Sequence, residues 1–520
     1  MIVLKKVVSI LICAVLIFGV FSVPASAVRT TSQKNCEDAI VNAVYNMKSE
    51  LDVSKYQIDR YQIDDIFSKI YYHYPELNFY FDFNNTRYTY SNYTYIVSKI
   101  SFVYTMDRST VNEKRKIIND AAAAVLYGID DNWSDTLKAL YIHDMLCVNY
   151  QYDNTLFTDE GNENHHMLEM IEDGAGVCQA YTEMYLYLLR LCGIDSYMMM
   201  SIEDNHSWNV VKIDNRWYHV DVTHDDPIVD RYASLDYIGR ASHEFFLLSD
   251  TEIDNGSHDN GYIPFEIDET VTCYKYTGND SFREAVSAVI PMDDGYWYYM
   301  DYDRNNGGLV KTKDFYNTQL VYGLDGFWEM NDSYGYYYYY TGLYEYNGNL
   351  FFIDYDTLYV YDLEDNKVEG VMELTEEGKK NGRFYGFYLY DGVCLFMVAK
   401  DANGLDMSVL TVGVCEYGHT IEKWETVTEA TMFQQGYKIK YCDICFDITD
   451  EEIIDKLPIP DGAGDCDDDG LIRSGDLAVL KLYLADNYMG TMGSGADFNK
   501  DNRIDAIDLS LLKLFLASAQ

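Results

Sequence analysis

The C-terminal part of the chain contains one loop-and-helix unit twice, at an offset of 32 residues. The segment 477–485 (LAVLKLYLA) recurs as 509–517 (LSLLKLFLA), and an acidic loop of twelve residues precedes each copy. Oxygen-bearing side chains at positions 1, 3, 5 and 12 of such a loop, with a backbone carbonyl at position 7, bind calcium in an EF-hand. The repeat therefore predicts two calcium sites, each followed by a helix.

The predicted calcium ligands are the following residues of the two loops: Asp465, Asp467, Asp469, Leu471 (carbonyl) and Asp476; Asp497, Asn499, Asp501, Arg503 (carbonyl) and Asp508. An ordinary EF-hand has Glu at position 12 and a helix before the loop, whereas these loops end in Asp and only a helix follows. The unit resembles a type I dockerin over residues 464–517, which implies a cohesin domain of a scaffoldin as partner. Two departures, Arg473 at position 9 of loop one and Asn502 in place of Gly in loop two, predict weaker calcium binding.

A second motif surrounds Cys178, which ends the run Gly-Ala-Gly-Val-Cys and precedes a helix-patterned segment up to Leu191. A thiol in the first turn of a helix lies at the positive end of the helix dipole, which favours the thiolate. The thiolate is the nucleophilic form of cysteine. The alternative is that Cys178 is a buried apolar residue, or one half of a disulfide with Cys147 or Cys192.

The partners of a thiol nucleophile are predicted on a hairpin with Asp214 and Asn215 as its two-residue turn. This turn pairs Ile213 with Arg216, so His206 and Asp221 lie diagonally on one face of the hairpin, within side-chain reach. A three-residue loop would reverse the faces. The hairpin alone leaves His219 as an equally good base.

These motifs together resemble the transglutaminase-like core of secreted bacterial proteins, over roughly residues 35–255. The resemblance rests on Gly-x-Gly-Val-Cys-x-Ala-Tyr (174–181), His-x-Trp-Asn (206–209) and Val-Asp-x-Thr-x-Asp-Asp-Pro (220–227), with further matches at 141–153 and 243–250. It implies Cys178 as nucleophile, His206 as base and Asp221 as the residue that orients the base. One departure is His224, where the family usually carries Trp.

The segment between these two motifs predicts β structure. From about 274 to 414, aromatic strands alternate with Asp-Gly and Asn-Gly turns, which indicates a Tyr-rich all-β domain of propeller, sheet or sandwich type. Cys415, His419, Cys442 and Cys445 then have zinc-like spacing, and their surroundings resemble a short zinc ribbon. A disulfide between Cys415 and either Cys442 or Cys445 is the alternative.

The N-terminal segment and the net charge of the chain indicate where the protein is located and which partners it can bind. Residues 1–27 have two lysines, an apolar stretch and an Ala-Ser-Ala site, which predicts a secretory signal peptide. No other stretch resembles a membrane span. The net charge of -46 argues against nucleic-acid binding, because phosphate recognition needs a basic surface. We therefore expect a secreted, extracellular protein, attached through its dockerin to a cell-surface cellulosome.

The sequence predicts a multidomain chain: an α+β papain/transglutaminase-like core, a Tyr-rich all-β domain, a zinc-ribbon-like segment and a helical EF-hand-like dockerin. The expected boundaries are 1–27 signal peptide, 28–134 N-terminal α/β region, 135–255 core, 274–414 β domain, 415–449 zinc-ribbon-like segment, 450–463 linker and 464–520 dockerin. The predicted activity is thiol acyl transfer on peptide or carboxamide bonds, with hydrolysis favoured over protein cross-linking. The setting that the dockerin implies is plant-polysaccharide breakdown, and a non-catalytic, scaffold-docked binding component is the rival interpretation.

Overall fold

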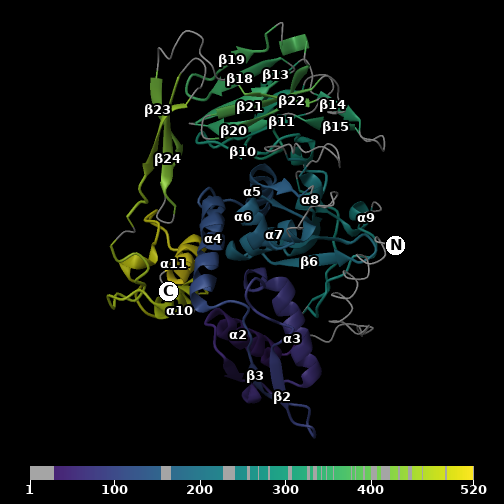
Figure 1. Cartoon of the computed structure of the whole chain (residues 1–520), viewed down its shortest axis with the longest axis vertical. Coiled ribbons are helices and arrows are strands. Elements are labelled where there is room, and N and C mark those ends of the chain that lie inside the picture. Colours follow the sequence, from purple (N-terminus) through teal and green to yellow (C-terminus); the bar gives the residue numbers. More distant parts are fainter. Residues whose placement is uncertain are drawn as a thin grey trace. The chain divides into compact units, whose positions relative to one another are not determined.

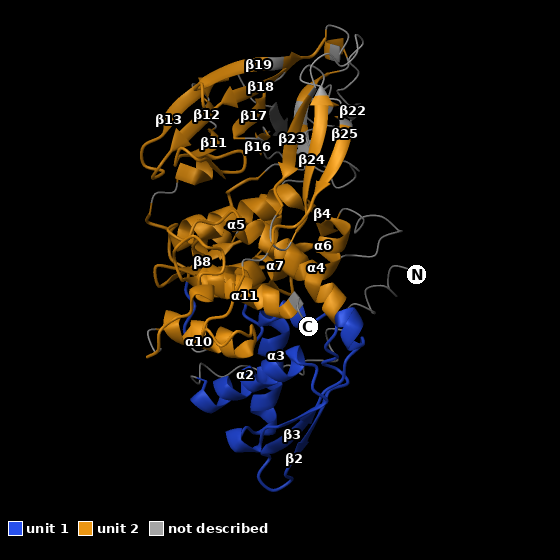
Figure 2. Cartoon of the chain, turned by 90° about the vertical axis from the view of Figure 1, so that its left-hand side faces the viewer, with its two compact units in different colours: residues 1–111, 262–272 blue, residues 112–261, 273–520 orange. Residues whose placement is uncertain are grey.

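A computed structural model gives the architecture of the chain (Figure 1). It describes residues 29–153, 165–226, 241–254, 258–267, 269–278, 281–301, 307–324, 328–331, 337–340, 342–346, 348–354, 356–375, 378–380, 382–390, 393–399, 407–411, 422–430, 434–442, 448–458, 461–485 and 489–518. The chain divides into two compact units (Figure 2). The first comprises residues 1–111 and 262–272, and the second comprises residues 112–261 and 273–520. The predicted signal peptide lies outside the described residues. Within the part that is described, no helix is both long enough and apolar enough to cross a membrane.

The first unit packs two helices with a small antiparallel sheet. Its elements are α2 (Thr31–Tyr45), α3 (Arg60–His73), β1 (Glu50–Asp52), β2 (Arg87–Tyr90) and β3 (Val97–Ser101), with strand order β1-β3-β2. Capping boxes begin both helices, Thr30 with Gln33 and Asp59 with Gln62, and they satisfy amides that the helices leave unpaired. The region expected as an N-terminal α/β region contains both helices and strands, and the residues of helix α4 (Arg108–Leu126) fall partly in the first unit and partly in the second.

The second unit contains a layer of helices on a four-stranded antiparallel sheet with order β6-β7-β8-β9. The elements are α5 (Asp135–Asn149), α6 (Met167–Asp173), α7 (Cys178–Leu191), β6 (Ser196–Ser201), β7 (His206–Ile213), β8 (Arg216–Val220), α8 (Val222–Asp225), β9 (Phe246–Leu248) and α9 (Asp250–Ile253). Helix α7 is buried along most of its length and packs against β6 and β7. Its first residue, Cys178, therefore has a fixed position relative to the sheet.

The hairpin of β7 and β8 has the predicted register. Asp214 and Asn215 have φ angles of 50° and 61°, the left-handed region that a two-residue hairpin turn of type I′ requires. Ile213 pairs with Arg216 at the turn, and the ladder continues to the pair of Asn209 and Val220. The side-chain faces of the hairpin are thus the predicted ones.

A buried network of two histidines and two carboxylates joins segments that are far apart in the sequence. Oδ1 of Asp144 accepts hydrogen bonds from His143 Nδ1 (2.7 Å) and His243 Nε2 (2.9 Å), and Oδ2 accepts from the amide of Val289 (2.6 Å). The other ring nitrogen of His143 donates to Asp225 at 3.1 Å. Burial opposes a charge on His143, but its two carboxylate partners raise its pKa to about 9. These hydrogen bonds connect α5 to α8 and to Val289, which lies after the core segment.

The region after the core consists of antiparallel sheets whose strands follow one another in sequence. They are β10 (Ile290–Pro291), β11 (Trp297–Asp301), β12 (Gly308–Thr312) and β13 (Gln319–Gly323); β14 (Trp328–Asn331) and β15 (Tyr337–Tyr340); β16 (Leu343–Tyr346), β17 (Asn349–Ile353), β18 (Thr357–Asp362) and β19 (Lys367–Glu373); β20 (Arg383–Tyr390), β21 (Val393–Ala399) and β22 (Met407–Thr411). The described part of this region contains strands, as predicted, and every described element of it beyond short 3-10 turns is a strand.

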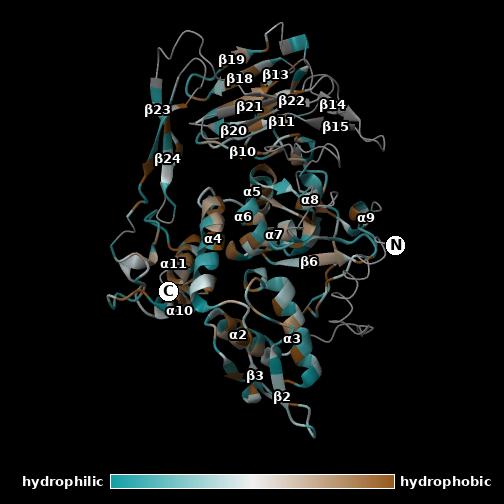
Figure 3. Ribbon diagram, in the orientation of Figure 1, coloured by the Kyte–Doolittle hydropathy of each residue, from teal (hydrophilic) through white to brown (hydrophobic). Residues whose placement is uncertain are grey.

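Three further strands and two helices complete the second unit. The strands are β23 (Glu422–Thr428), β24 (Gly436–Cys442) and β25 (Ile448–Ile454), so β25 continues past position 450, where the linker was expected to begin. The helices are α10 (Ser474–Leu484) and α11 (Ala506–Ser518), one in each copy of the repeat, and both are rich in apolar residues (Figure 3). Leu480 and Leu512 are buried in the core that the helices share, with Leu477, Leu509 and Leu516 at its edge. Leu484, the last residue of α10, is 36% exposed.

The buried network generates a stability prediction. In Asp144→Asn, the anion that accepts three hydrogen bonds is lost beside a charged imidazole, so we expect the free energy of unfolding to fall by about 3–5 kcal/mol. His143 has a folded pKa of about 9 against 6.5 unfolded, so its contribution is complete below pH 6.5 and is lost as the pH rises through 9.

Denaturant unfolding of the full chain at pH 6 and at pH 9.5 measures both effects. The matched control is Asp195→Asn, which changes an exposed carboxylate and is expected to leave stability within about 0.5 kcal/mol of wild type. Equal stabilities for Asp144→Asn and Asp195→Asn would contradict the structural role of the network.

Candidate active site

Cys178 begins helix α7 at a sharp change of chain direction. Gly174, with φ of 75°, ends α6, and the chain passes through Ala175–Gly176 (β5) before α7 begins. A Cβ on Gly176 would lie 2.8 Å from side-chain atoms of both Ala180 and Met170, so only glycine allows this close approach of the chain to α7. The thiol is thus held at the positive end of a 14-residue helix, as predicted.

His206 and Asp221 lie beside this thiol at the ends of β7 and β8. His206 Nε2 is 2.6 Å from Asp221 Oδ2, and the imidazole lies near enough to Cys178 to lower the pKa of its thiol. Oδ1 of Asp221 accepts the backbone amides of Thr223 (3.0 Å) and His224 (3.2 Å), since Asp221 caps the short helix α8. The structure therefore brings together the three residues that the sequence analysis selected.

The electrostatics of these three groups favour an ion pair between thiolate and imidazolium. Burial disfavours charge on His206, but Asp221 outweighs it and raises the pKa of the imidazole to about 10. Burial also opposes ionisation of Cys178, yet the hydrogen bond and charge of His206 lower the pKa of the thiol below 9.0. The pKa of Asp221 stays well below 3.8 in spite of burial, because His206 and His224 are adjacent. Such an arrangement can carry out nucleophilic attack and proton transfer.

The rival base His219 has a different environment. Its Nδ1 accepts a hydrogen bond from Trp208 Nε1 (3.0 Å), and its Nε2 is 3.0 Å from Asp250 Oδ1. Burial, opposed by Asp250, lowers the pKa of His219. Both ring nitrogens of His219 are therefore occupied by partners other than Asp221 and Cys178.

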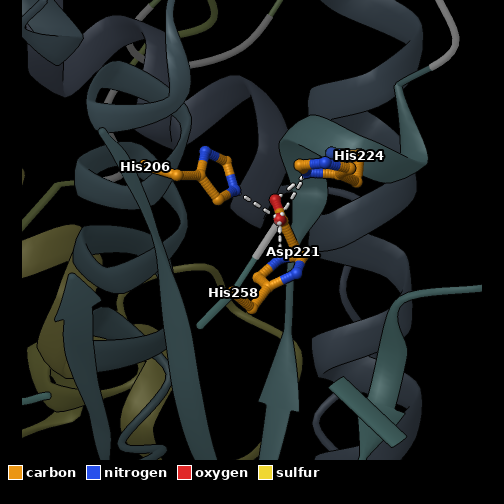
Figure 4. Close-up of side chains that lie close together, drawn as sticks. All are labelled: His206, Asp221, His224 and His258. Carbon is orange, nitrogen blue, oxygen red and sulfur yellow. Dashed lines mark hydrogen bonds and ion pairs between the residues drawn. The ribbon is translucent and has the colours of Figure 1, made fainter. Parts of the chain in front are cut away.

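Two more histidines surround Asp221, as Figure 4 shows. His258 Nε2 and His224 Nδ1 each lie 2.7 Å from Asp221 Oδ2, the oxygen that His206 also contacts. Sequence analysis noted His224 as a departure from the family pattern, and it missed His258 altogether. His258 follows Asp221 by 37 residues and comes from a loop, where no periodic pattern could have indicated its position.

The disulfide alternative for Cys178 does not fit the structure. Cys147, Cys178 and Cys192 are all free thiols.

The first acidic loop of the repeat has the geometry of a calcium loop. Oxygens of Asp465, Asp467 and Asp469 lie within 4.8 Å of one another, which fits calcium–oxygen distances of about 2.3–2.6 Å. Asp476 is fully buried and accepts the amides of Cys466 (2.7 Å) and Arg473 (2.9 Å). The side chain of Arg473 forms an ion pair with Asp469. The guanidinium of Arg473 therefore competes with calcium for one predicted ligand.

The second loop repeats this pattern of hydrogen bonds. Asp497 accepts the amides of Asp501 (3.1 Å) and Asn502 (3.0 Å), as Asp465 accepts those of Asp469 and Gly470 in loop one. Asp508 accepts the amide of Phe498 at 2.6 Å. Asn502 has φ of 69° where loop one has glycine, and asparagine tolerates this conformation better than most residues. The second loop therefore has the same backbone hydrogen bonds as the first, and the oxygens of Asp501 and Asp505 lie within 4.8 Å of each other and of Asp131.

The predicted zinc ligands cannot be placed in the same way. Cys415, His419 and Cys445 lie outside the described residues, and Cys442 is the last residue of β24.

Comparisons with known proteins agree with the two motifs. Residues 124–222 match the family model of the transglutaminase-like superfamily, and residues 463–517 match that of the dockerin type I domain. The chain therefore contains a transglutaminase-like segment, which includes Cys178, His206 and Asp221, and a type I dockerin domain. Both resemblances seen in the sequence are confirmed.

Two solved structures are similar to part of the chain. One is a TGase, at 12% identity and a TM-score of 0.19, with 26% of this chain and 44% of that chain covered. The other, from Cytophaga hutchinsonii, is named as a candidate cysteine protease, at 15% identity and a TM-score of 0.17, with 27% of this chain and 61% of that chain covered. The chain thus spans less than two thirds of either protein. Among curated proteins, none matches the chain.

The charge arrangement predicts selective alkylation of Cys178. At pH 6–7, iodoacetamide is expected to modify Cys178 well before Cys192, because burial raises the pKa of Cys192 to about 12. His206→Ala removes the imidazolium and is expected to slow the reaction at least tenfold, while His219→Gln leaves the rate near that of wild type.

Peptide mapping of the labelled full chain over a time course measures these rates. Equal labelling of Cys178 and Cys192 would contradict the predicted thiolate, and a slow reaction in His219→Gln alone would show that His219 is the base.

Proposed function

We propose that this protein is a secreted thiol acyl-transfer enzyme, most simply a cysteine peptidase or amidase, that docks onto an extracellular scaffold. The observation that carries the proposal is the chain of contacts from Cys178 through His206 to Asp221, at the start of a buried helix. The match of residues 124–222 to the transglutaminase-like superfamily supports it.

In the proposed reaction, the Cys178 thiolate attacks a peptide or carboxamide carbonyl and forms a carbon–sulfur bond. The backbone amide of Cys178, in the first turn of α7, is free to donate to the developing oxyanion. His206 then gives its proton to the leaving amine as the carbon–nitrogen bond breaks. Asp221 holds the ring by its Nε2 and stabilises the imidazolium before that transfer.

The acyl-enzyme is resolved by water or by an amine. Water attacks with His206 as base, releases the carboxylic acid and restores the thiol, which is hydrolysis. A primary amine that takes the same place would form a new amide, which is the cross-linking reaction of a transglutaminase. We favour hydrolysis because water is the more abundant acceptor outside a cell.

The dockerin supports a location on a scaffold. Type I dockerins bind calcium, and a cohesin of a scaffoldin is the partner that such a module implies. Calcium would be held by the carboxylates of the two loops and would neutralise their mutual repulsion. We propose that this module places the enzyme in a cellulosome, in the setting of plant-polysaccharide breakdown.

Trapping of the acyl-enzyme tests the proposed chemistry. When the calcium-loaded full chain is quenched in acid with a library of peptides and peptide carboxamides, we expect an acyl adduct on Cys178 by mass spectrometry. Cys178→Ala should lose the adduct, the matched control Cys192→Ala should keep it, and His206→Ala should slow turnover by about 10²–10⁴-fold.

The reaction products show whether water or an amine accepts the acyl group. Free carboxylic acid as the main product in the presence of a competing primary amine would support hydrolysis, whereas the amine conjugate would show cross-linking. A folded wild-type protein that forms no adduct with any member of the library would favour the non-catalytic binding component.

Calcium binding by the repeat is the second prediction of the proposal. The chelator-stripped full chain is expected to bind two calcium ions in isothermal titration calorimetry. Asp476→Asn should remove one ion, since it changes a buried ligand of loop one, and the exposed control Asp461→Asn should keep both. Two ions bound by Asp476→Asn would contradict the assignment of loop one.

A further inference from the structure

Four side chains around Asp221 form a compact cluster of metal-ligating groups. His206 Nε2, His224 Nδ1 and His258 Nε2 lie 2.6, 2.7 and 2.7 Å from Oδ2 of Asp221. All four ligand atoms lie within 4.8 Å of one another. Figure 4 shows the three rings converging on the carboxylate from different sides.

This cluster has more donors than its acceptor can accommodate. A carboxylate oxygen offers about two lone-pair sites, and three ring nitrogens approach Oδ2. Oδ1 cannot relieve the crowding, because it already accepts the amides of Thr223 and His224. The three rings are also crowded: the centroid of His224 is 4.7 Å from that of His206 and 4.9 Å from that of His258, and the centroids of His206 and His258 are 5.2 Å apart. Oδ2 of Asp221 alone cannot accept a hydrogen bond from each of the three rings.

A single divalent cation fits these groups better than three protons. Zinc binds neutral imidazole nitrogens and carboxylate oxygens at about 2.0–2.2 Å in a tetrahedron, in which ligand atoms lie about 3.3 Å apart. The nitrogen–oxygen distances in the cluster would each have to open by about 0.6 Å, a change that a small rotation of the side chains provides.

We propose that His206, Asp221, His224 and His258 form a binding site for a divalent transition-metal ion of the zinc type. The ion is held on the side of His206 that faces Asp221, and the Cys178 thiol is not one of its ligands. Access is from the side of His224, whose side chain is 33% exposed, whereas His258 is fully buried.

The other buried histidine clusters lack these features. His143 donates from its two ring nitrogens to two different carboxylates, and the oxygens of Asp144 share one more imidazole and one amide. His219 already has Trp208 and Asp250 as partners. Only the Asp221 cluster, among those the structure describes, gathers three imidazoles around one oxygen.

The test is zinc binding to the calcium-loaded full chain, measured by calorimetry and by metal analysis after gel filtration. The proposal expects that His258→Phe and His224→Phe each lose one bound zinc per chain, and that the exposed control His165→Phe retains it. His224→Phe serves as the safer variant for folding, since its side chain is partly exposed. Use of a Cys442→Ser background removes any zinc held by the predicted Cys415–Cys445 ligands.

A variant without the Cys178 thiol separates this site from a metal held by the nucleophile. Cys178→Ala is expected to bind zinc as tightly as the protein with Cys178. Cobalt bound in place of zinc to the protein with Cys178 should give no sulfur-to-metal charge-transfer band. Unchanged zinc content in both His224→Phe and His258→Phe, or loss of the ion in Cys178→Ala, would overturn the proposal.

Discussion

The buried carboxylate of Asp221 is the anion around which the transglutaminase-like segment is arranged. It follows β8, caps α8 with one oxygen, and contacts three imidazoles with the other. An unpaired carboxylate at 1% exposure would be costly, so its neighbours must supply donors or positive charge. One of those neighbours is His206, which also lies beside the Cys178 thiol and lowers its pKa. The charge that the fold buries at Asp221 is therefore the charge that favours the thiolate at the start of α7.

The same physical requirement explains why the core needs a second buried network. Asp144 and Asp225 are also without exposure to solvent, and His143 and His243 satisfy them from α5 and from the loop before β9. This explains why the segments 141–153 and 243–250, which contain no nucleophile or base, belong to the motif seen in the sequence. Their role is to hold α8, and with it Asp221, in place.

Local sequence patterns were sufficient to predict those residues of the candidate site whose positions depend on a single short segment of the chain. The Asp214–Asn215 turn sets the hairpin register, and that register places His206 beside Asp221. The repeat likewise predicted α10 and α11, because each helix directly follows its loop. His258 could not be predicted, since a loop brings it to Asp221 from a distant position and no pattern marks it. The zinc ligands Cys415, His419, Cys442 and Cys445 remain a prediction, since three of them lie outside the described residues.

The central claim is that Asp221, through His206, keeps Cys178 ionised. The most direct measurement is the ultraviolet absorbance of the thiolate in metal-free protein as a function of pH, with Cys178→Ala subtracted as the blank. We predict a thiolate signal near neutral pH in the wild type, and its disappearance in Asp221→Asn until the pH exceeds about 9, the ordinary range of a thiol. An identical titration curve in wild type and Asp221→Asn would contradict the account.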